Sequence, residues 1–93
     1  MGVDSLLDEI NGRLTAITVK YPDTHPFIWS YQKHVQFALK NPEKANVGKV
    51  IKKGREWLSE MMWKHPLFRP EFSRIVEAID RFENREFGGS SAS

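Results

Sequence analysis

The chain has 93 residues, of which 40% are hydrophobic and 28% charged, and it carries a formal net charge of +2 and no cysteine. This length suffices for one domain only, and the lack of cysteine excludes disulfides and thiolate metal sites. Residues 1–10 lack the basic start and the apolar run of a signal peptide, and no apolar stretch approaches the roughly 20 residues that span a bilayer. These features predict a cytoplasmic protein that does not enter a membrane.

The first half of the chain contains two predicted helices. Residues 4–20 form the first, because their apolar side chains recur at helical spacing on one face, which comprises Leu6, Leu7, Ile10, Leu14, Ile17 and Tyr21. The proline-containing segment 21–26 ends this helix, and Asp23 or Thr24 is suited to cap the next one. The second helix is predicted over residues 26–40, with a core face made of Phe27, Ile28, Tyr31, Val35, Ala38 and Leu39.

The second half of the chain repeats this plan. Asn46 is suited to cap a third helix over residues 47–64, whose core face comprises Val47, Val50, Ile51, Trp57, Leu58 and Met61. Gly54 lies in the middle of that helix, where the absence of a side chain allows a neighbouring helix to approach closely. Segment 65–70 breaks the chain again. The fourth helix is predicted over residues 70–86, with a core face made of Phe72, Ile75, Val76, Ile79 and Phe82.

Four such helices predict an all-α fold, a four-helix bundle. Each half of the chain forms an antiparallel hairpin, and the two hairpins stack because one hairpin cannot bury its own apolar stripe. Lys-Tyr-Pro at residues 20–22 recurs as Lys-His-Pro at residues 64–66, an offset of 44 residues. An internal duplication and a shared need for similar corners explain this recurrence equally well. Residues 1–87 are the predicted domain, and residues 88–93 are a predicted disordered tail that is either native or added to the chain.

Metal-binding groups lack the spacing that their chemistry requires. The chain has three histidines, His25, His34 and His65. They form no His-x-x-x-His or Glu-x-x-His pair, which is the usual arrangement of metal ligands on helices. The sequence therefore predicts no metal site, and these side chains are expected at the corners and at the edge of the core.

Catalytic arrangements are also absent from the sequence. The predicted fourth helix carries three carboxylates at helical spacing, Glu77, Asp80 and Glu83. Arginines of the same helix lie at pairing distance from them, which predicts a salt-bridged, solvated face rather than an acid–base pair. No serine lies in a nucleophile elbow, and no glycine loop is placed to bind phosphate. The chain is therefore predicted not to be an enzyme and to need no cofactor.

Basic residues concentrate in the middle of the chain. Between residues 33 and 55 seven basic residues accompany a single acidic one, a net charge of +6, so the rest of the chain sums to −4. Three of them, Lys49, Lys52 and Lys53, are predicted near the start of the third helix, where the helix dipole disfavours cations. A local cost without a local gain indicates an anionic partner. The alternative is a lysine face that is merely solvated.

An aromatic and basic stripe overlaps this region. On the predicted second helix, Trp29 and Phe37 point away from the apolar face, with Lys33 between them and Lys40 beyond. Aromatic and cationic groups together suit capture of an acidic, apolar peptide or stacking on nucleic-acid bases. The alternative is that this helix is buried on two sides, so that Trp29 or Phe37 belongs to the core.

These features predict a non-enzymatic protein–protein interaction module, a small adaptor or regulator. Its predicted partner is a protein with an acidic and apolar surface, and its predicted binding residues are Trp29, Lys33, Phe37, Lys40, Lys49, Lys52 and Lys53. The alternative is a nucleic-acid-binding protein that uses the surface of residues 29–55. The nearly balanced total charge favours the first, because nucleic-acid binders are usually basic over the whole domain. Regions of opposite sign also favour self-association.

Overall fold

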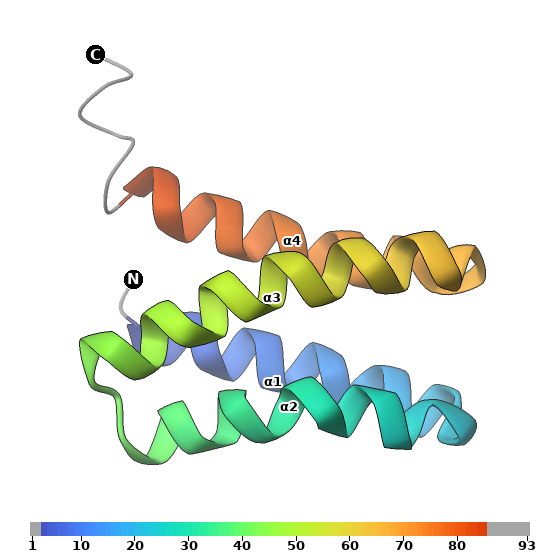
Figure 1. The fold of residues 1–93 in the computed structure, drawn as a ribbon, viewed down its shortest axis with the longest axis horizontal. Coiled ribbons are helices and arrows are strands. Elements are labelled where there is room, and N and C mark those ends of the chain that lie inside the picture. Colours follow the sequence, from blue (N-terminus) through green and yellow to red (C-terminus); the bar gives the residue numbers. More distant parts are fainter. Residues whose placement is uncertain (1–2, 86–93) are drawn as a thin grey trace.

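The computed structural model of the protein describes residues 3–85. Within this part of the chain all regular structure is helical, which confirms the predicted all-α class (Figure 1). The elements are α1 (Val3–Lys20), η1 (Pro22–Thr24), α2 (His25–Lys40), α3 (Lys44–Lys64), η2 (Pro66–Phe68) and α4 (Arg69–Glu83). None of these helices is both long enough and apolar enough to cross a membrane.

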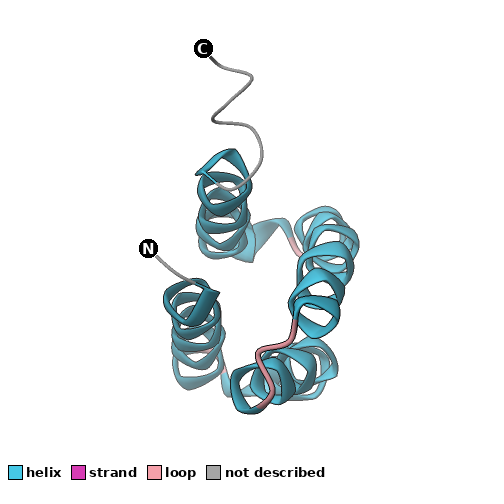
Figure 2. Cartoon of the chain, turned by 90° about the vertical axis from the view of Figure 1, so that its left-hand side faces the viewer, coloured by secondary structure: helices cyan, strands magenta, loops and turns pink. Residues whose placement is uncertain are grey.

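The four long helices form the predicted bundle of two antiparallel hairpins. α1 packs against α2 and α4, and α3 packs against the same two helices. An end-on view therefore shows four helices arranged around a common centre (Figure 2). Successive helices run in opposite directions, so both proline corners lie at one end of the bundle, while the α2–α3 connection lies at the other (Figure 1). This arrangement gives each helix one inward face and leaves a wide outward face exposed.

The core follows the predicted apolar faces closely. Leu14, Leu58 and Ile79 are completely buried, as expected for residues at the centre of a predicted apolar face. Six residues of the predicted faces are only partly buried and pack against the core from its edge, namely Tyr21, Phe27, Leu39, Ile51, Trp57 and Val76. The buried hydrophobic residues are Leu6, Leu7, Ile10, Leu14, Ile17, Ile28, Tyr31, Val35, Ala38, Val47, Val50, Leu58, Met61, Phe72, Ile75, Ala78, Ile79 and Phe82.

The two proline corners have the same backbone geometry, 44 residues apart. Tyr21 has φ −131° and ψ 80°, and His65 has φ −130° and ψ 68°. Each of these residues donates its backbone N–H to the carbonyl four residues earlier, over 2.8 Å in both corners. The corners also pack together, since the Tyr21 and Phe68 rings lie 4.6 Å apart. An internal duplication stays a prediction, because two hairpins with the same proline corner would share this geometry without a common origin.

The predicted side-chain caps do not form. Thr24 is buried and its hydroxyl donates to the Tyr21 carbonyl over 2.7 Å instead. Because η1 continues directly into α2, the His25 backbone N–H already finds an acceptor in the Pro22 carbonyl. α3 begins at Lys44 and not at residue 47, and Asn46 lies inside it, where its side-chain amide donates to the Asn41 carbonyl over 2.9 Å.

The end of the chain differs in part from the prediction. α4 covers Arg69–Glu83, whereas the sequence predicted a helix over residues 70–86. Residue 86 and the predicted tail at residues 88–93 lie outside the described residues. The proposed boundary between domain and tail therefore stays a prediction.

A close approach of α2 and α3 occurs at Gly54, as the sequence indicated. The Tyr31 hydroxyl donates to the Val50 carbonyl over 2.9 Å, and a Cβ atom built on Gly54 would overlap that hydroxyl. The Tyr31 side chain is buried, and this burial raises its pKa. On its other side the Tyr31 ring stacks on Trp57, with ring centroids 5.0 Å apart. These contacts set the spacing of α2 and α3, the two helices that carry the predicted binding residues.

Candidate interaction surface on α2 and α3

The stripe predicted on the second helix is exposed. Trp29 keeps 42% of its surface accessible and Phe37 keeps 57%, and Lys33 and Lys40 are exposed as well. The alternative, that Trp29 or Phe37 belongs to the core, is therefore wrong. α2 is covered by α1 on one side and by α3 on the other, and no third helix packs on its outward face within residues 3–85. Trp29 lies against His25 of the first turn, with ring centroids 6.4 Å apart.

The lysines of the third helix are also exposed, but the predicted cost of placing them near the positive end of the helix dipole is absent. Lys49, Lys52 and Lys53 are solvent-accessible. Because α3 begins at Lys44, they lie beyond its first turn, where the dipole has little effect. Their position therefore carries no local penalty that a partner would relieve. The concentration of charge is what indicates an anionic partner.

The basic residues of this region divide into paired and unpaired groups. Arg55 forms ion pairs with Asp80, over 2.7 Å, and with Glu83, both on α4. Among residues 3–85 no ion pair involves the six lysines of the segment, Lys33, Lys40, Lys44, Lys49, Lys52 and Lys53. The positive charge of these six lysines is therefore not neutralised by an ion pair within residues 3–85.

Two acidic residues of α4 form ion pairs with a neighbouring helix of the bundle. The predicted pairing with arginines of the same helix is wrong within the described residues, since Asp80 and Glu83 bind Arg55 of α3. Arg81 instead pairs with Glu9 of α1 over 3.1 Å. These pairs tie α4 to its two neighbours, so part of the negative charge that favoured self-association is already neutralised.

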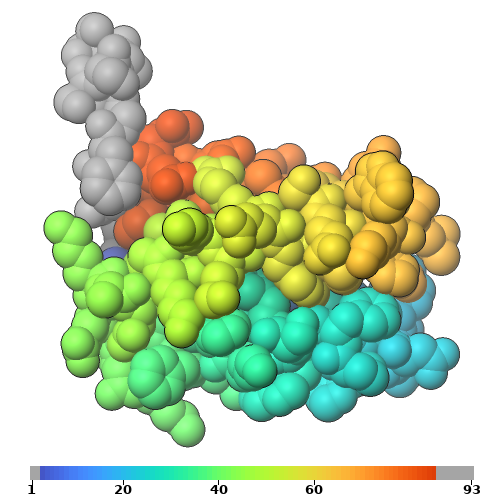
Figure 3. All heavy atoms as spheres, viewed as in Figure 1, coloured from blue at the N-terminus to red at the C-terminus, as the bar shows by residue number. Residues whose placement is uncertain are grey.

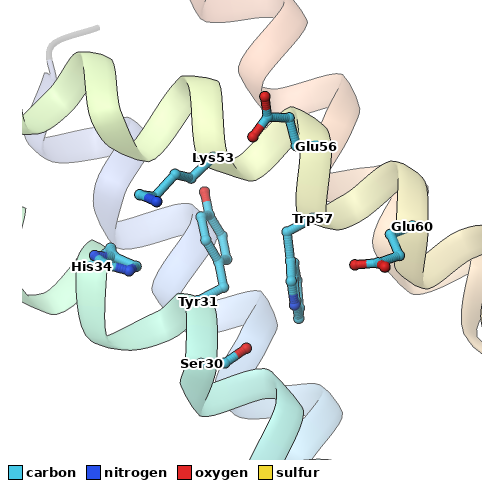
Figure 4. A pocket seen from close by; sticks show the side chains of 7 residues that line it. All are labelled: Ser30, Tyr31, His34, Lys53, Glu56, Trp57 and Glu60. Carbon is cyan, nitrogen blue, oxygen red and sulfur yellow. The ribbon is translucent and has the colours of Figure 1, made fainter.

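A groove separates α2 from α3 beside this surface (Figure 4). It has a volume of about 500 Å³ and is lined by Ser30, Tyr31, His34, Lys53, Glu56, Trp57 and Glu60. Figure 4 shows His34 and Lys53 on one side of Tyr31, and Trp57 and Glu60 on the other. The seven residues come from α2 and α3, at positions that are far apart in the sequence. Helical periodicity describes one helix at a time and therefore did not reveal the groove. The one signal of the groove in the local sequence is that polar residues flank Trp57, although Trp57 belongs to a predicted core face.

The electrostatic environment of His34 reflects the lysines around it. Partial burial, and then the positive charges of Lys49, Lys53 and Lys33, lower the pKa of His34 from its usual value of 6.5. The imidazole is therefore neutral at pH 7. An anion placed beside it would offset the lysine charges and favour its protonated form.

The depressed pKa of His34 predicts a loss of stability in mild acid. The unfolded chain binds the proton of His34 more tightly than the folded protein does. The contribution of the neutral imidazole to the free energy of unfolding is therefore present above about pH 6.5 and is lost as the pH falls through the folded-state pKa of His34. Chemical unfolding of the protein and of a His34→Gln variant, each measured at about pH 7.5 and about pH 5.5, checks this. We expect the variant to lose less stability between the two conditions. Equal losses would contradict the assignment to His34.

The other two histidines pack against aromatic rings at the corner end. His25 lies against Trp29, and His65 stacks on Phe27 with ring centroids 4.9 Å apart and an interplanar angle of 4°. Within residues 3–85 no group of three or more potential metal ligands gathers in one place.

Comparison with known proteins gives no further information about this surface. No protein family, no curated protein and no solved structure shows significant similarity to the chain. Four-helix bundles serve many unrelated functions, so the fold by itself does not indicate one.

Proposed function

We propose that the chain is a non-enzymatic protein-interaction module that binds a partner through the outer surface of α2 and α3. The observation that carries the proposal is the exposure of Trp29 and Phe37 among lysines that no carboxylate of residues 3–85 neutralises. Figure 3 views the molecule from the side on which α2 and α3 lie in front. The partner that fits is a protein whose surface is acidic and partly apolar.

The two kinds of side chain would contribute differently to binding. An exposed Trp or Phe gains free energy when a partner covers it, and Trp is enriched among the residues that dominate interface energies. Lysines at the rim remain solvated and mainly accelerate association by long-range attraction. Trp29 and Phe37 would therefore be the anchors, with Lys33 between them and Lys40, Lys49, Lys52 and Lys53 around them.

Replacing Trp29 by alanine should weaken binding by more than about 1 kcal/mol while leaving the fold intact. The partner is first isolated by using the tagged protein as bait in an extract of its native cells, and affinity is then measured by titration calorimetry. Trp63→Ala is the matched control, because Trp63 is 79% exposed on α3 and does not belong to the proposed binding residues. It should bind as the parent protein does. Loss of the fold in Trp29→Ala, or unchanged affinity, would refute this surface.

A nucleic acid is the second candidate partner, and the unneutralised lysines are the observation that favours it. In that case nuclease treatment of the extract would abolish capture. Affinity would also fall log-linearly with salt, with the slope reduced by about 1 for each phosphate contact removed. The balance of the whole chain, at a net charge of only +2, is the reason to place a protein partner first.

A further inference from the structure

The floor of the α2–α3 groove is aromatic and rigid. Tyr31 stacks on Trp57, and Phe72 meets the same indole edge-on, with ring centroids 5.5 Å apart. Tyr31 is held by its hydrogen bond to Val50 and by the lack of a side chain at Gly54. Trp57 is thus fixed on two sides, yet it is only half-buried and lines the groove. A preformed aromatic surface of this kind binds an apolar side chain at little cost in ordering.

The charged groups divide the groove into two ends. Lys53 and His34 lie at one end, and Lys33 and Lys49 act on the same imidazole from nearby. Glu60 lies at the other end, where it pairs with Lys64 over 3.1 Å, and Glu56 lies on the α3 wall. Lys53 attracts a negative group of a ligand, whereas Glu56, which forms no ion pair within residues 3–85, and Glu60 repel it, so the negative group would be oriented toward Lys53 and His34.

The hollow on the opposite side of the bundle differs from this groove, although another hollow, between α3 and α4, is larger at about 680 Å³. The hollow between α1 and α4 has a volume of about 110 Å³, against about 500 Å³ between α2 and α3. Two of its lining cations are paired, Arg13 with Glu9 over 3.1 Å and Lys20 with Glu71 over 3.9 Å, whereas Arg74 forms no ion pair within residues 3–85. The α2–α3 groove alone of the two combines an open aromatic surface with a lysine that forms no ion pair within residues 3–85.

We propose that this groove receives an acidic peptide segment of the partner protein, with an apolar side chain over Trp57 and an adjoining carboxylate beside Lys53 and His34. The inference rests on the proposed protein-binding function and names the chemistry that its surface recognises. A peptide is the occupant that fits, because the groove is open along the two helices and Lys53 belongs both to the groove and to the lysine surface next to it. A partner seated on Trp29 and Lys33 could extend a chain directly into it.

The test uses two dipeptides that differ only in charge, acetyl-Asp-Phe-amide and acetyl-Asn-Phe-amide. The protein has three tryptophans, so its nitrogen-15 NMR spectrum separates the indole signal of Trp57 from those of Trp29 and Trp63. We expect the aspartyl peptide to shift the Trp57 signal saturably and the asparaginyl peptide to bind several-fold more weakly. No saturable shift at Trp57, or equal binding of both peptides, would overturn the proposal.

Matched charge variants show whether the groove itself is the site. Lys53→Glu removes a lining cation, whereas Lys52→Glu makes the same change of charge one residue away without lining the groove. We expect at least about fivefold weaker peptide binding for Lys53→Glu and less than about twofold for Lys52→Glu. Equal effects would mean general attraction by the lysines, and the groove would be rejected.

The pH dependence provides a readout that a purely structural role would not change. A carboxylate bound beside His34 raises the pKa of the imidazole, so binding should tighten as the pH falls from about 7.5 to about 6. His34 is faced by Lys33 of its own helix and by Lys49 and Lys53 of α3, and these lysines stay charged throughout. His34→Gln should flatten the profile, and an unchanged slope in this variant would reject contact with His34.

Failure of this inference can be told apart from failure of the proposed function. If Trp57 does not respond to the peptide while Trp29→Ala still weakens partner binding, the interaction surface stands and the groove is rejected. If the peptide binds at Trp57 while Trp29→Ala binds the partner normally, the groove stands and the α2 stripe is rejected.

Discussion

Truncation of Leu58 to alanine should lower the free energy of unfolding by about 2–5 kcal/mol, the range found for a buried leucine that leaves a cavity. Leu58 is completely covered near the middle of α3. All four helices contribute buried side chains to the same core, so the cavity cannot be closed without moving several of them. A domain of this size is stabilised by about 5–15 kcal/mol in total, and the loss is therefore a large share. Urea unfolding followed by circular dichroism measures it.

The chain offers a matched control for this substitution. Leu67, in η2, is 76% exposed, so Leu67→Ala removes the same atoms without opening a cavity. Its effect should stay within about 0.5 kcal/mol. A loss below about 0.5 kcal/mol at Leu58 would show that the apolar face of α3 does not point into the core.

The second large effect is expected at Gly54, where alanine should destabilise the bundle despite its better helix propensity. A Cβ atom at this position would overlap the Tyr31 hydroxyl and lie 3.0 Å from its Cζ atom. Tyr31 cannot move away freely, because it is buried, hydrogen-bonded to Val50 and stacked on Trp57. Overpacking typically costs about 1–3 kcal/mol, while the gain in propensity is at most about 1 kcal/mol. We expect a net loss of about 1–2 kcal/mol in chemical unfolding.

Two further substitutions separate the steric cause from any general effect of alanine. Gly12 and Gly48 also lie within helices, but a Cβ atom on either would meet nothing within 4 Å. Gly12→Ala and Gly48→Ala should therefore stabilise the protein by up to about 1 kcal/mol. Adding Tyr31→Phe to Gly54→Ala removes the overlapping oxygen and should recover part of the loss. If Gly54→Ala behaves like the other two alanines, the close approach of α2 and α3 is not real.

The sequence was sufficient to predict the helices and their inward faces. Apolar side chains at helical spacing identify the face that must leave water, and proline removes a backbone donor, so the corners can be placed without knowing what the helices touch. Leu14, Leu58 and Ile79 were predicted in the core on this basis and are fully covered. These are properties of single segments.

The helix starts could not be predicted as well, because capping depends on what precedes a helix. Asn46 has the right chemistry for a cap, but the chain turns into α3 early enough that this residue lies within the helix. Its amide then finds an acceptor in Asn41. The competing partner exists only once the α2–α3 connection has its three-dimensional form.

The candidate surface was predicted in part. The outward direction of Trp29 and Phe37 follows from helical spacing, yet their exposure depends on which helices close around α2. The packing of the four helices determines this exposure, since α2 contacts α1 and α3 and its outward side stays open within residues 3–85. Arg55 illustrates the reverse case, because its carboxylate partners on α4 could not be identified from local spacing.

The groove was decided by the tertiary structure alone. His34 and Lys53 are 19 positions apart in the sequence, and only the packing of α2 against α3 brings them to one end of the same hollow (Figure 4). The depth of that hollow depends on the absence of a side chain at Gly54, which leaves room for Tyr31, and its charge depends on Lys53, Glu56 and Glu60 of the lining. Helical periodicity indicates which side of a single helix is buried, whereas a site between two helices depends on the distance and register of those helices. The contacts between the side chains of α2 and α3 set this distance and register.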